Sequence, residues 1–267
     1  MTLRETFDGA AELYDRMRPG YPEALFDDLS EIARLGPGSR VLELGCGTGQ
    51  ATVALARRGY EIVAIELGAG LADVARRNLA GFPAVRVITA AFESWPLPAE
   101  PFDAVFAATS FHWIDPAVRI AKSAEALRPA GALAVVSTHH VAGGDERFFA
   151  DVQRCYERWD PQTPPGVRQP APGEVPHADL GAGGRFGQAS YRRYEREIAY
   201  STEEYRDLLL TYSGHRAMNP EAQGALLACI ADLIDREHGG RIAKRYLNEL
   251  AVACVADAAA SPAAAAG

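Results

Sequence analysis

A glycine-rich loop between a strand and a helix constrains the fold of this chain more than any other feature. Residues 43–50 read ELGCGTGQ, follow a short apolar run and lead into a helical pattern. Glycines at positions 45, 47 and 49 permit a tight turn and let a ligand approach the backbone closely. The spacing G-x-G-x-G differs from the G-x-G-x-x-G of dinucleotide-binding loops. The loop indicates either a ligand-binding site between the strand and the helix or a turn that only connects the two.

Two acidic residues near this loop favour the ligand site. Glu43 stands two positions before the first glycine, where a carboxylate would face a cationic ligand rather than a phosphate. Glu66 follows the next expected strand, about 20 residues beyond the loop, where a carboxylate accepts both hydroxyls of a ribose. Since the strand, the helix and Glu66 are all in place, we interpret the loop as functional.

The residues around the loop alternate between strand-like and helix-like segments, which predicts a doubly wound sheet. Strands separated by helices imply βαβ crossovers and a mostly parallel sheet of the Rossmann-like α/β class, with helices on both faces. Continuous apolar runs fit strands that are covered on both sides. Over residues 40–138 we expect strands at 41–44, 61–65, 85–88, 102–107 and 132–137, and helices at 50–58, 70–79 and 116–127.

The remaining sequence is less regular, and we expect it to complete a single domain over residues 1–256. Its parts are an N-terminal lid segment at 1–30, a cofactor-binding core at 40–138, and a substrate-side insertion with C-terminal strands and helices at 145–256. The composition of residues 257–267, which end in SPAAAAG, predicts a disordered tail. In the C-terminal half we expect helices at 145–159, 202–211 and 220–237, a Pro/Gly-rich loop or lid at 161–187, and a strand at 189–200. Residues 241–255 form a last strand or helix, and the pattern favours a strand at their start.

Composition and charge exclude several classes of protein. The 267 residues carry a net charge of -8, which argues against a general nucleic-acid or anionic-membrane binder. No apolar run reaches the roughly 20 residues that span a bilayer, and the first residues do not resemble a signal peptide, so we expect a cytoplasmic protein. The four cysteines lie far apart and form no C-x-x-C pair, so we expect free thiols at Cys46, Cys155, Cys229 and Cys254.

Residues 43–49 resemble the first motif, E/D-x-G-x-G-x-G, of the class I S-adenosylmethionine-dependent methyltransferases. The resemblance covers roughly residues 10–255, and it looks closest to the small-molecule branch with type 11 and type 25 methyltransferase domains and trans-aconitate methyltransferases. It implies S-adenosyl-L-methionine as cofactor and a seven-stranded sheet of order 3-2-1-4-5-7-6 with the last strand antiparallel. The cofactor would lie at the carboxyl ends of strands one and two, beside the switch in strand order.

Further motifs of this resemblance imply the cofactor contacts. Residues 14–22 (YDRMRPGYP) resemble a Y-x-x-x-R-P-x-Y-P segment in which Tyr14 and Arg18 close over the ligand, with Arg18 near the methionine carboxylate. Residues 91–98 (AFESWPLP) resemble the adenine-binding segment, with Ala91 where the family often has Asp. The implied cofactor contacts are Tyr14, Arg18, Glu43, Gly45, Cys46, Gly47, Gly49, Glu66, Leu67, Phe92, Glu93 and Ala108.

The candidate catalytic residues are histidines that follow strands at the ligand edge of the sheet. Methyl transfer from a sulfonium needs two reactants held about 3 Å apart without water, and a base only if the acceptor must lose a proton. His112 and His139 are candidate bases because histidine titrates near neutral pH. We expect substrate contacts at Trp113, His140 and Tyr212, and no metal site.

The predicted function is methyl transfer to a small-molecule acceptor, by O-methylation of a carboxylate or a hydroxyl, in a monomer or homodimer without nucleic-acid or membrane partners. Three alternatives stay open: a cofactor-binding protein without catalysis, a methyltransferase acting on RNA or protein, and a dinucleotide oxidoreductase. The loop spacing disfavours the oxidoreductase. Residues 108–111 (ATSF) lack the N-P-P-[YF] motif of amino-group methylation.

Overall fold

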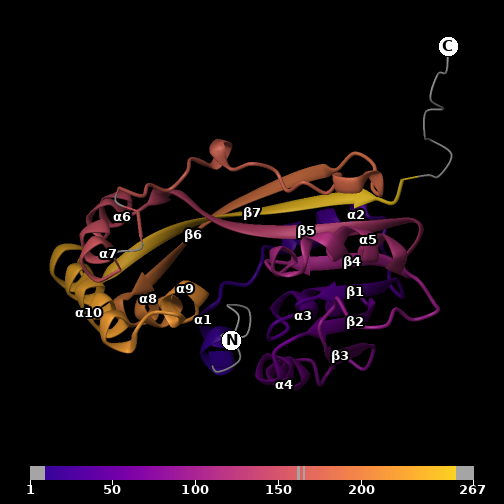
Figure 1. Ribbon diagram of the computed structural model, residues 1–267, viewed down its shortest axis with the longest axis horizontal. Helices are drawn as coiled ribbons and strands as arrows, with labels where there is room; N and C mark the ends of the chain where they lie inside the picture. Colours follow the sequence, from indigo (N-terminus) through magenta and orange to yellow (C-terminus); the bar gives the residue numbers. More distant parts are fainter. Residues whose placement is uncertain (1–9, 161–162, 165, 257–267) are drawn as a thin grey trace, which may run out of the picture.

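A seven-stranded sheet runs through the computed structural model, which describes residues 10–160, 163–164 and 166–256 (Figure 1). The strand order is β3-β2-β1-β4-β5-β7-β6, parallel from β3 to β5 and antiparallel at β7, as the sequence predicted. The predicted tail at 257–267 lies outside the described residues. The strands are β1 (Arg40–Leu44), β2 (Glu61–Glu66), β3 (Val85–Thr89), β4 (Phe102–Ala108), β5 (Leu127–Gly144), β6 (Ser190–Ser201) and β7 (Arg241–Cys254).

Apolar cores lie on both faces of the parallel part of the sheet, because successive side chains of a strand point to opposite faces. In β1, Val41 belongs to one core, whereas Leu42 and Leu44 belong to the other. Asp115 is the N-cap residue of the helix that follows it on one face of the sheet. Its carboxylate accepts a hydrogen bond from Ala117 N at 2.8 Å and so fixes where that helix begins. The helices of this half are α1 (Ala11–Met17), α2 (Glu23–Ile32), α3 (Gln50–Arg57), α4 (Ala69–Asn78) and α5 (Pro116–Ala126), with a 3-10 turn η3 (Phe111–Trp113).

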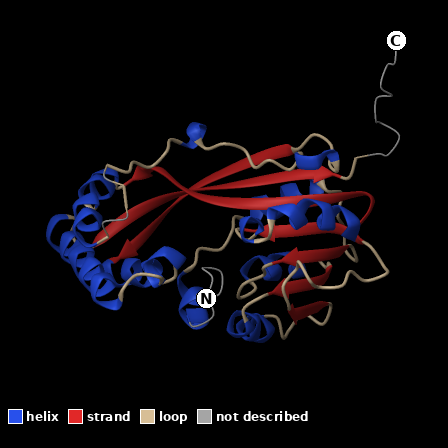
Figure 2. Cartoon of the chain, in the orientation of Figure 1, coloured by secondary structure: helices blue, strands red, loops and turns tan. Residues whose placement is uncertain are grey.

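Strands β5, β6 and β7 continue beyond the parallel part of the sheet and carry a group of helices, which we call the distal cap (Figure 2). The cap has its own apolar core, in which Phe148, Leu226 and Ile230 are fully buried. The three long strands therefore join two separately packed cores. The distal cap consists of α6 (Glu146–Asp151), α7 (Gln153–Trp159), α8 (Thr202–Leu209), α9 (Ser213–Arg216) and α10 (Pro220–Glu237).

The length of β5 corrects one sequence prediction. The strand continues to Gly144 instead of ending at residue 137, so His139 and His140 lie within a strand and not in a loop after it. Their pairing partners are on β7, about a hundred residues later in the chain, and local sequence does not show such a pairing. Residues 145–159 likewise form two helices, α6 and α7, instead of one.

The described part of the Pro/Gly-rich segment between α7 and β6 packs against the long strands. Val175 and Leu180 of this segment are buried, and Ala142 N of β5 donates a hydrogen bond to Pro170 O at 2.8 Å. The segment contains 3-10 turns η4 (Pro172–Glu174) and η5 (Ala182–Gly184). Within the described ranges, none of the helices combines the length and the apolar character that crossing a bilayer requires.

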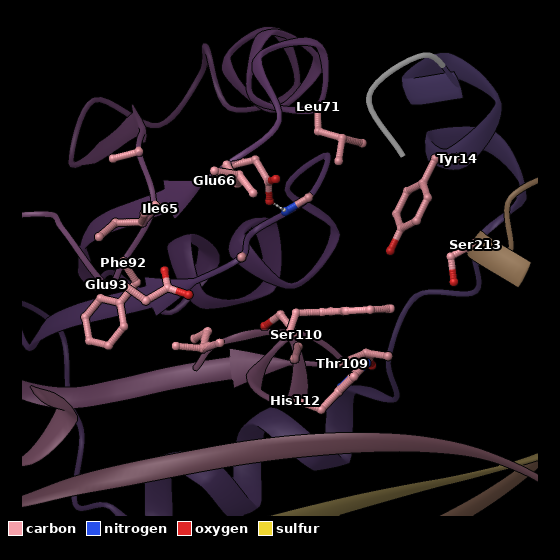
Figure 3. A pocket seen from close by; sticks show the side chains of 18 of the residues that line it. Tyr14, Ile65, Glu66, Leu71, Phe92, Glu93, Thr109, Ser110, His112 and Ser213 are labelled. Atoms are coloured by element: carbon pink, nitrogen blue, oxygen red, sulfur yellow. Dashed lines mark hydrogen bonds between the residues drawn. The ribbon is translucent and has the colours of Figure 1, made fainter. Parts of the chain in front are cut away.

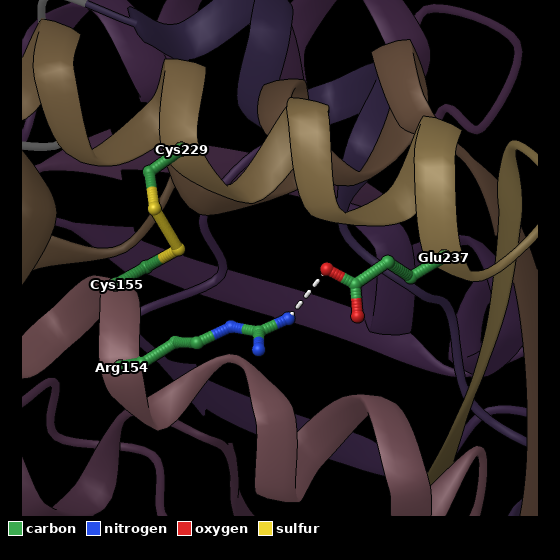
Figure 4. The surroundings of a disulfide bond; sticks show 4 residues. All are labelled: Arg154, Cys155, Cys229 and Glu237. Carbon is green, nitrogen blue, oxygen red and sulfur yellow. Dashed lines mark hydrogen bonds and ion pairs between the residues drawn. A yellow bond between two sulfur atoms is a disulfide. The ribbon is translucent and has the colours of Figure 1, made fainter.

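A disulfide bond in the distal cap corrects the prediction of four free thiols (Figure 4). Cys155 of α7 and Cys229 of α10 are bonded, with Cα atoms 5.8 Å apart, whereas Cys46 and Cys254 are free. The bonded cysteines are 74 residues apart in sequence, and only the packing of α7 against α10 brings them together. The Arg154–Glu237 ion pair, with N and O atoms 2.7 Å apart, joins the same two helices.

We expect reduction of this disulfide to destabilise the protein. A bond that closes a loop of this length stabilises the folded state by about 2–4 kcal/mol, so the melting temperature should fall by roughly 5 °C or more in a strong reductant. Calorimetry with and without the reductant measures this shift. The Cys155→Ser/Cys229→Ser double variant, which keeps the free thiols at Cys46 and Cys254, should melt at one temperature under both conditions. A wild-type melting temperature that ignores the reductant would contradict the bond.

Candidate functional site

A pocket lies at the carboxyl ends of β1, β2 and β4, where residues of α1 and α9 meet them (Figure 3). This is the position at which open α/β sheets bind ligands, beside the switch in strand order. Phe92 and Glu93 lie toward one end of the pocket, and Tyr14 and Ser213 toward the other. The predicted site residues that line it are Tyr14, Arg18, Gly45, Gly47, Glu66, Leu67, Phe92, Glu93, Ala108, His112, Trp113 and Tyr212.

The glycine loop adopts a backbone conformation that side chains would obstruct. Gly45 and Gly47 have φ angles of 67° and 57°, in the left-handed region that favours glycine. A Cβ atom at Gly45 would lie 2.6 Å from Cβ of Ser110, and Gly45 N donates a hydrogen bond to Ile65 O at 2.8 Å. Because these contacts leave no room for a side chain at Gly45, and the positive φ angle disfavours one at Gly47, backbone atoms form this wall of the pocket.

Glu66 ends β2 and holds the glycine loop in place. Its Oε2 atom accepts a hydrogen bond from Gly47 N at 2.9 Å, drawn as a dashed line in Figure 3, and its Oε1 atom accepts one from Gly68 N at 2.9 Å. The residue is only 7% exposed, and hydrogen bonds to a carboxylate are stronger than those between neutral groups. Two backbone donors therefore fix one carboxylate on the pocket wall.

Three loop residues with predicted cofactor contacts, Glu43, Cys46 and Gly49, do not line this pocket. Glu43 and Cys46 line a small adjoining cavity, and Gly49 is the N-cap residue of α3. The Glu43 side chain is 1% exposed, and its Oε2 atom has no hydrogen-bond partner among the described residues. Burial raises the pKa of Glu43 to about 7, so this carboxyl keeps its proton more readily than an exposed one.

Arg18 closes the pocket at the side of the distal cap. Its guanidinium carbon lies 5.0 Å from the ring centroid of Tyr14 and 4.4 Å from that of Tyr212. Its Nη2 atom donates a hydrogen bond to Thr211 O at 2.9 Å. Gln50 of α3 donates a hydrogen bond to Arg18 O at 2.9 Å, which ties this segment to the glycine loop. The Arg18 side chain thus contacts both α1 and the cap.

Phe92 and Glu93 form the opposite side of the pocket. Phe92 is 4% exposed, and the ammonium of Lys122 lies 5.3 Å from its ring centroid. Lys122 Nζ also donates hydrogen bonds to Glu93 O at 3.0 Å and to Trp95 O at 2.6 Å. These contacts from α5 hold the segment after β3 rigidly against the pocket.

His112 lies on the turn after β4 and lines the pocket together with Trp113. The two ring centroids are 4.9 Å apart. Burial lowers the pKa of His112, and the nearby Arg119 lowers it further. The imidazole is therefore mostly neutral at pH 7 and able to accept a proton.

His139 and His140 do not line the pocket. As neighbours within β5 they point to opposite faces of the sheet. The His140 ring lies 4.4 Å from that of Phe149 in the distal cap, and burial lowers the pKa of His140 to about 3. Across the described part of the chain, no group of three or more His, Cys, Asp or Glu side chains has the arrangement of a metal site.

Thr109 lines the pocket and was missed by the sequence predictions, whereas Ser213 lines it beside Tyr212, where a substrate contact was expected. Thr109 directly follows β4 and has a φ angle of 56°, an unusual value for a residue other than glycine. Its hydroxyl lies 3.0 Å from the Tyr21 hydroxyl and 3.1 Å from that of Thr138. The position of Thr109 at the carboxyl end of a strand is the sequence signal that could have identified it.

Part of the sequence is similar to known methyltransferases. The sequence model of a family described as "Methyltransferase domain" matches residues 41–131. An uncharacterized methyltransferase of Mycobacterium tuberculosis (strain H37Rv) is 38% identical over 131 residues, which make up 49% of this chain and 51% of that protein. The chain thus spans about half the length of the curated relatives that it matches in this way.

Solved structures with a similar fold cover most of the chain. A candidate type II methyltransferase from Anaeromyxobacter dehalogenans aligns with a TM-score of 0.59 and 24% identity over 89% of this chain and 97% of that one. Haemonchus contortus phosphoethanolamine N-methyltransferase 2, in complex with phosphomonomethylethanolamine and S-adenosylhomocysteine, aligns with a TM-score of 0.55 and 14% identity over 96% and 61%. At these identities the likeness shows the fold alone.

The buried Glu43 predicts a pH dependence of stability. The folded carboxyl titrates near pH 7 and an unperturbed one near 4.5, so between these values the unfolded state binds fewer protons. Wild-type stability should therefore fall as the pH rises from 5 to 8, by an amount on the order of 3 kcal/mol. Glu43→Gln should lack this loss in urea unfolding at the two pH values. Equal pH dependence in both proteins would contradict the assignment.

Proposed function

We propose that this chain, which carries a methyltransferase domain of the class I S-adenosylmethionine-dependent type, binds S-adenosyl-L-methionine in the pocket and methylates a small-molecule acceptor. The observation that carries the proposal is the glycine loop held to Glu66 at the carboxyl end of β2. A loop of this shape brings backbone close to the ligand, and the carboxylate beside it suits ribose hydroxyls. The family match over 41–131 includes both features.

The residues of the pocket fit the three parts of this cofactor. Glu66 would accept hydrogen bonds from the ribose, and the apolar ring of Phe92 with Glu93 would hold the adenine. Arg18 would pair with the methionine carboxylate, since a guanidinium binds a carboxylate through paired donors. Arg18 supports this role because its Nε atom is buried and has no hydrogen-bond partner among the described residues.

The residues of the chain contribute mainly positioning and exclusion of water. The cofactor would supply a methyl group on a sulfonium sulfur, and transfer would form an oxygen–carbon bond in line with the carbon–sulfur bond that breaks, with S-adenosylhomocysteine as the leaving group. Tyr14 and Arg18 would cover the ligand from the N-terminal segment, and Tyr212 and Ser213 from the cap. Where the acceptor is a hydroxyl, His112 would take its proton. A carboxylate acceptor needs no such step.

Glu66 provides the test of cofactor binding. S-adenosylhomocysteine should bind the wild type in calorimetry, whereas Glu66→Ala should weaken binding at least about tenfold, because a charge-assisted hydrogen bond is lost. Glu66→Gln keeps an oxygen that can accept a hydrogen bond from the loop. Comparison of the two variants therefore distinguishes loss of the loop's hydrogen bond from loss of the contact with the ribose. Glu61→Ala, at the exposed start of β2, is the matched control. Unchanged affinity in Glu66→Ala would place the ribose elsewhere.

His112 provides the test of turnover. Incubation of the protein with methyl-labelled cofactor and a metabolite extract should yield a labelled product, which identifies the acceptor. For a hydroxyl acceptor, His112→Gln should lower turnover about a hundredfold. It should also remove the loss of activity that the wild type shows at acidic pH, where its imidazole becomes protonated and can no longer accept a proton. S-adenosylhomocysteine affinity should not change. An unaltered pH profile would restrict His112 to packing against Trp113.

A further inference from the structure

Tyr212 lies between two cations at the side of the pocket where the distal cap meets it. It lines the pocket and is only partly buried, so a ligand in the pocket can contact it. Its hydroxyl accepts a hydrogen bond from Lys244 Nζ at 3.0 Å, and the Arg18 guanidinium carbon lies 4.4 Å from its ring centroid. The two charges that act most strongly on this phenol are therefore both positive.

Lys244 is a buried ammonium whose neighbours include two aromatic rings. It lies on β7, is 5% exposed, and is 5.0 Å and 5.1 Å from the ring centroids of Tyr212 and Tyr246. It forms no ion pair with a carboxylate of the described residues. A buried ammonium is costly unless an opposite charge lies near it. If Tyr212 loses its proton, its phenolate supplies that charge through the existing hydrogen bond.

The other titratable groups around Tyr212 behave differently. Burial raises the pKa of each neighbouring tyrosine. Burial also lowers the pKa of His215, whose ring centroid lies 5.9 Å from that of Tyr212, to about 4, so this imidazole is neutral near pH 7. Burial alone would raise the pKa of Tyr212 as well, but Lys244 and Arg18 lower it, and the Tyr246 hydroxyl acts in the same direction. The neighbouring tyrosines are Tyr14 of α1, Tyr156 of α7, Tyr200 of β6, Tyr205 of α8 and Tyr246 of β7.

The other charges near this phenol do not oppose the two cations. Carboxylates act on its neighbours, since Asp160, which follows α7, acts on His215, and Glu66 acts on Tyr14. Arg196 of β6, which pairs with the residue two positions beyond Lys244 on β7, adds a third positive charge on this side. The surroundings of the phenol therefore favour an anion.

The two candidate bases of the pocket differ in how well they suit a weakly acidic proton. A general base works best when its pKa lies near the operating pH. Burial and Arg119 lower the pKa of His112, which moves this histidine away from neutral pH and makes it a weaker base. The two cations lower the pKa of Tyr212, which moves this tyrosine toward neutral pH while leaving it the stronger base.

We propose that Tyr212 is a catalytic base that takes the proton from a weakly acidic hydroxyl of the methyl acceptor, and that Lys244 and Arg18 stabilise its phenolate form. This inference rests on the proposed function and adds a base for acceptors whose proton His112 is too weak a base to remove. Tyr212 Oη takes the proton, and the acceptor oxygen forms a bond to the methyl carbon. The electron pair of the carbon–sulfur bond goes to sulfur as S-adenosylhomocysteine leaves. Tyr212 then loses the proton to water, and Lys244 acts as a positioning residue.

The first test needs no acceptor. The near-ultraviolet absorbance of tyrosinate, followed against pH in the protein without ligand, should show that one of the ten tyrosines ionises below the ordinary pKa of about 10. Tyr212→Phe should lack this ionisation. Lys244→Met should move it to a higher pH by about 1 or more, and Lys244→Arg should restore it. Tyr205→Phe, which changes another buried tyrosine of the cap, is the matched control and should keep it.

The second test is methyl transfer from labelled cofactor to the metabolite extract. The wild-type rate should rise with pH over the range in which the tyrosinate forms. Tyr212→Phe should lower the rate about a hundredfold and leave S-adenosylhomocysteine affinity unchanged, because its ring remains. In Lys244→Met the rise should move to higher pH together with the tyrosinate, whereas a rise caused by ionisation of the acceptor would not move. Arg245→Met, whose arginine pairs with Glu197, removes a charge from the next residue of β7 and should change neither measurement.

The outcomes separate the two proposals. If S-adenosylhomocysteine does not bind the wild type, or if no labelled product forms, the proposed function fails and the role of Tyr212 fails with it. If both occur and Tyr212→Phe keeps the early ionisation, or keeps the wild-type rate and pH profile, only the role of Tyr212 is overturned. Circular dichroism of Lys244→Met and Lys244→Arg distinguishes a change in the phenol from loss of the fold.

Discussion

The antiparallel pairing of β7 with β5 and β6 is the constraint on which the rest of the structure depends. β7 runs between the other two long strands, and all three extend past the parallel strands that carry the glycine loop (Figure 1). The distal cap is attached to the chain only through their ends and through the segments that join them. The position of Tyr212 over the pocket therefore depends on this strand pairing, together with the hydrogen bond from Arg18 to Thr211 O.

The pocket itself depends on a more local interaction, in which the Glu66 carboxylate accepts hydrogen bonds from Gly47 N and Gly68 N. It fixes the loop after β1 relative to the connection after β2, so two neighbouring strand ends form one surface. The same carboxylate lines the pocket. Because Glu66 both shapes the loop and lines the pocket, the loop and Glu66 together are more informative about the site than either is alone.

Local patterns made the fold of the parallel half and much of the pocket predictable. The glycine spacing, the strand before it and Glu66 lie within 25 residues of one another, and their geometry follows from short-range backbone chemistry. The disulfide, the length of β5 and the placement of His139 and His140 were not predictable in this way. Each depends on a partner about 70 or more residues away in sequence, Cys229 for Cys155 and β7 for β5.

The two faces of β7 treat buried charge in different ways. Glu249 and Lys244 are both almost fully buried on the same strand, and both would be costly to leave unpaired. The fold supplies Glu249 with Arg193 and a backbone N–H. Among the described residues, Lys244 donates a hydrogen bond to the Tyr212 hydroxyl and lies near the rings of Tyr212 and Tyr246. Burial alone would raise the pKa of Tyr212, but the charges of Lys244 and Arg18 lower it, so this phenol ionises more readily than an ordinary one. One face of the strand therefore pairs its buried charge with an opposite charge, whereas the other pairs it with a phenol whose ionisation the nearby cations promote.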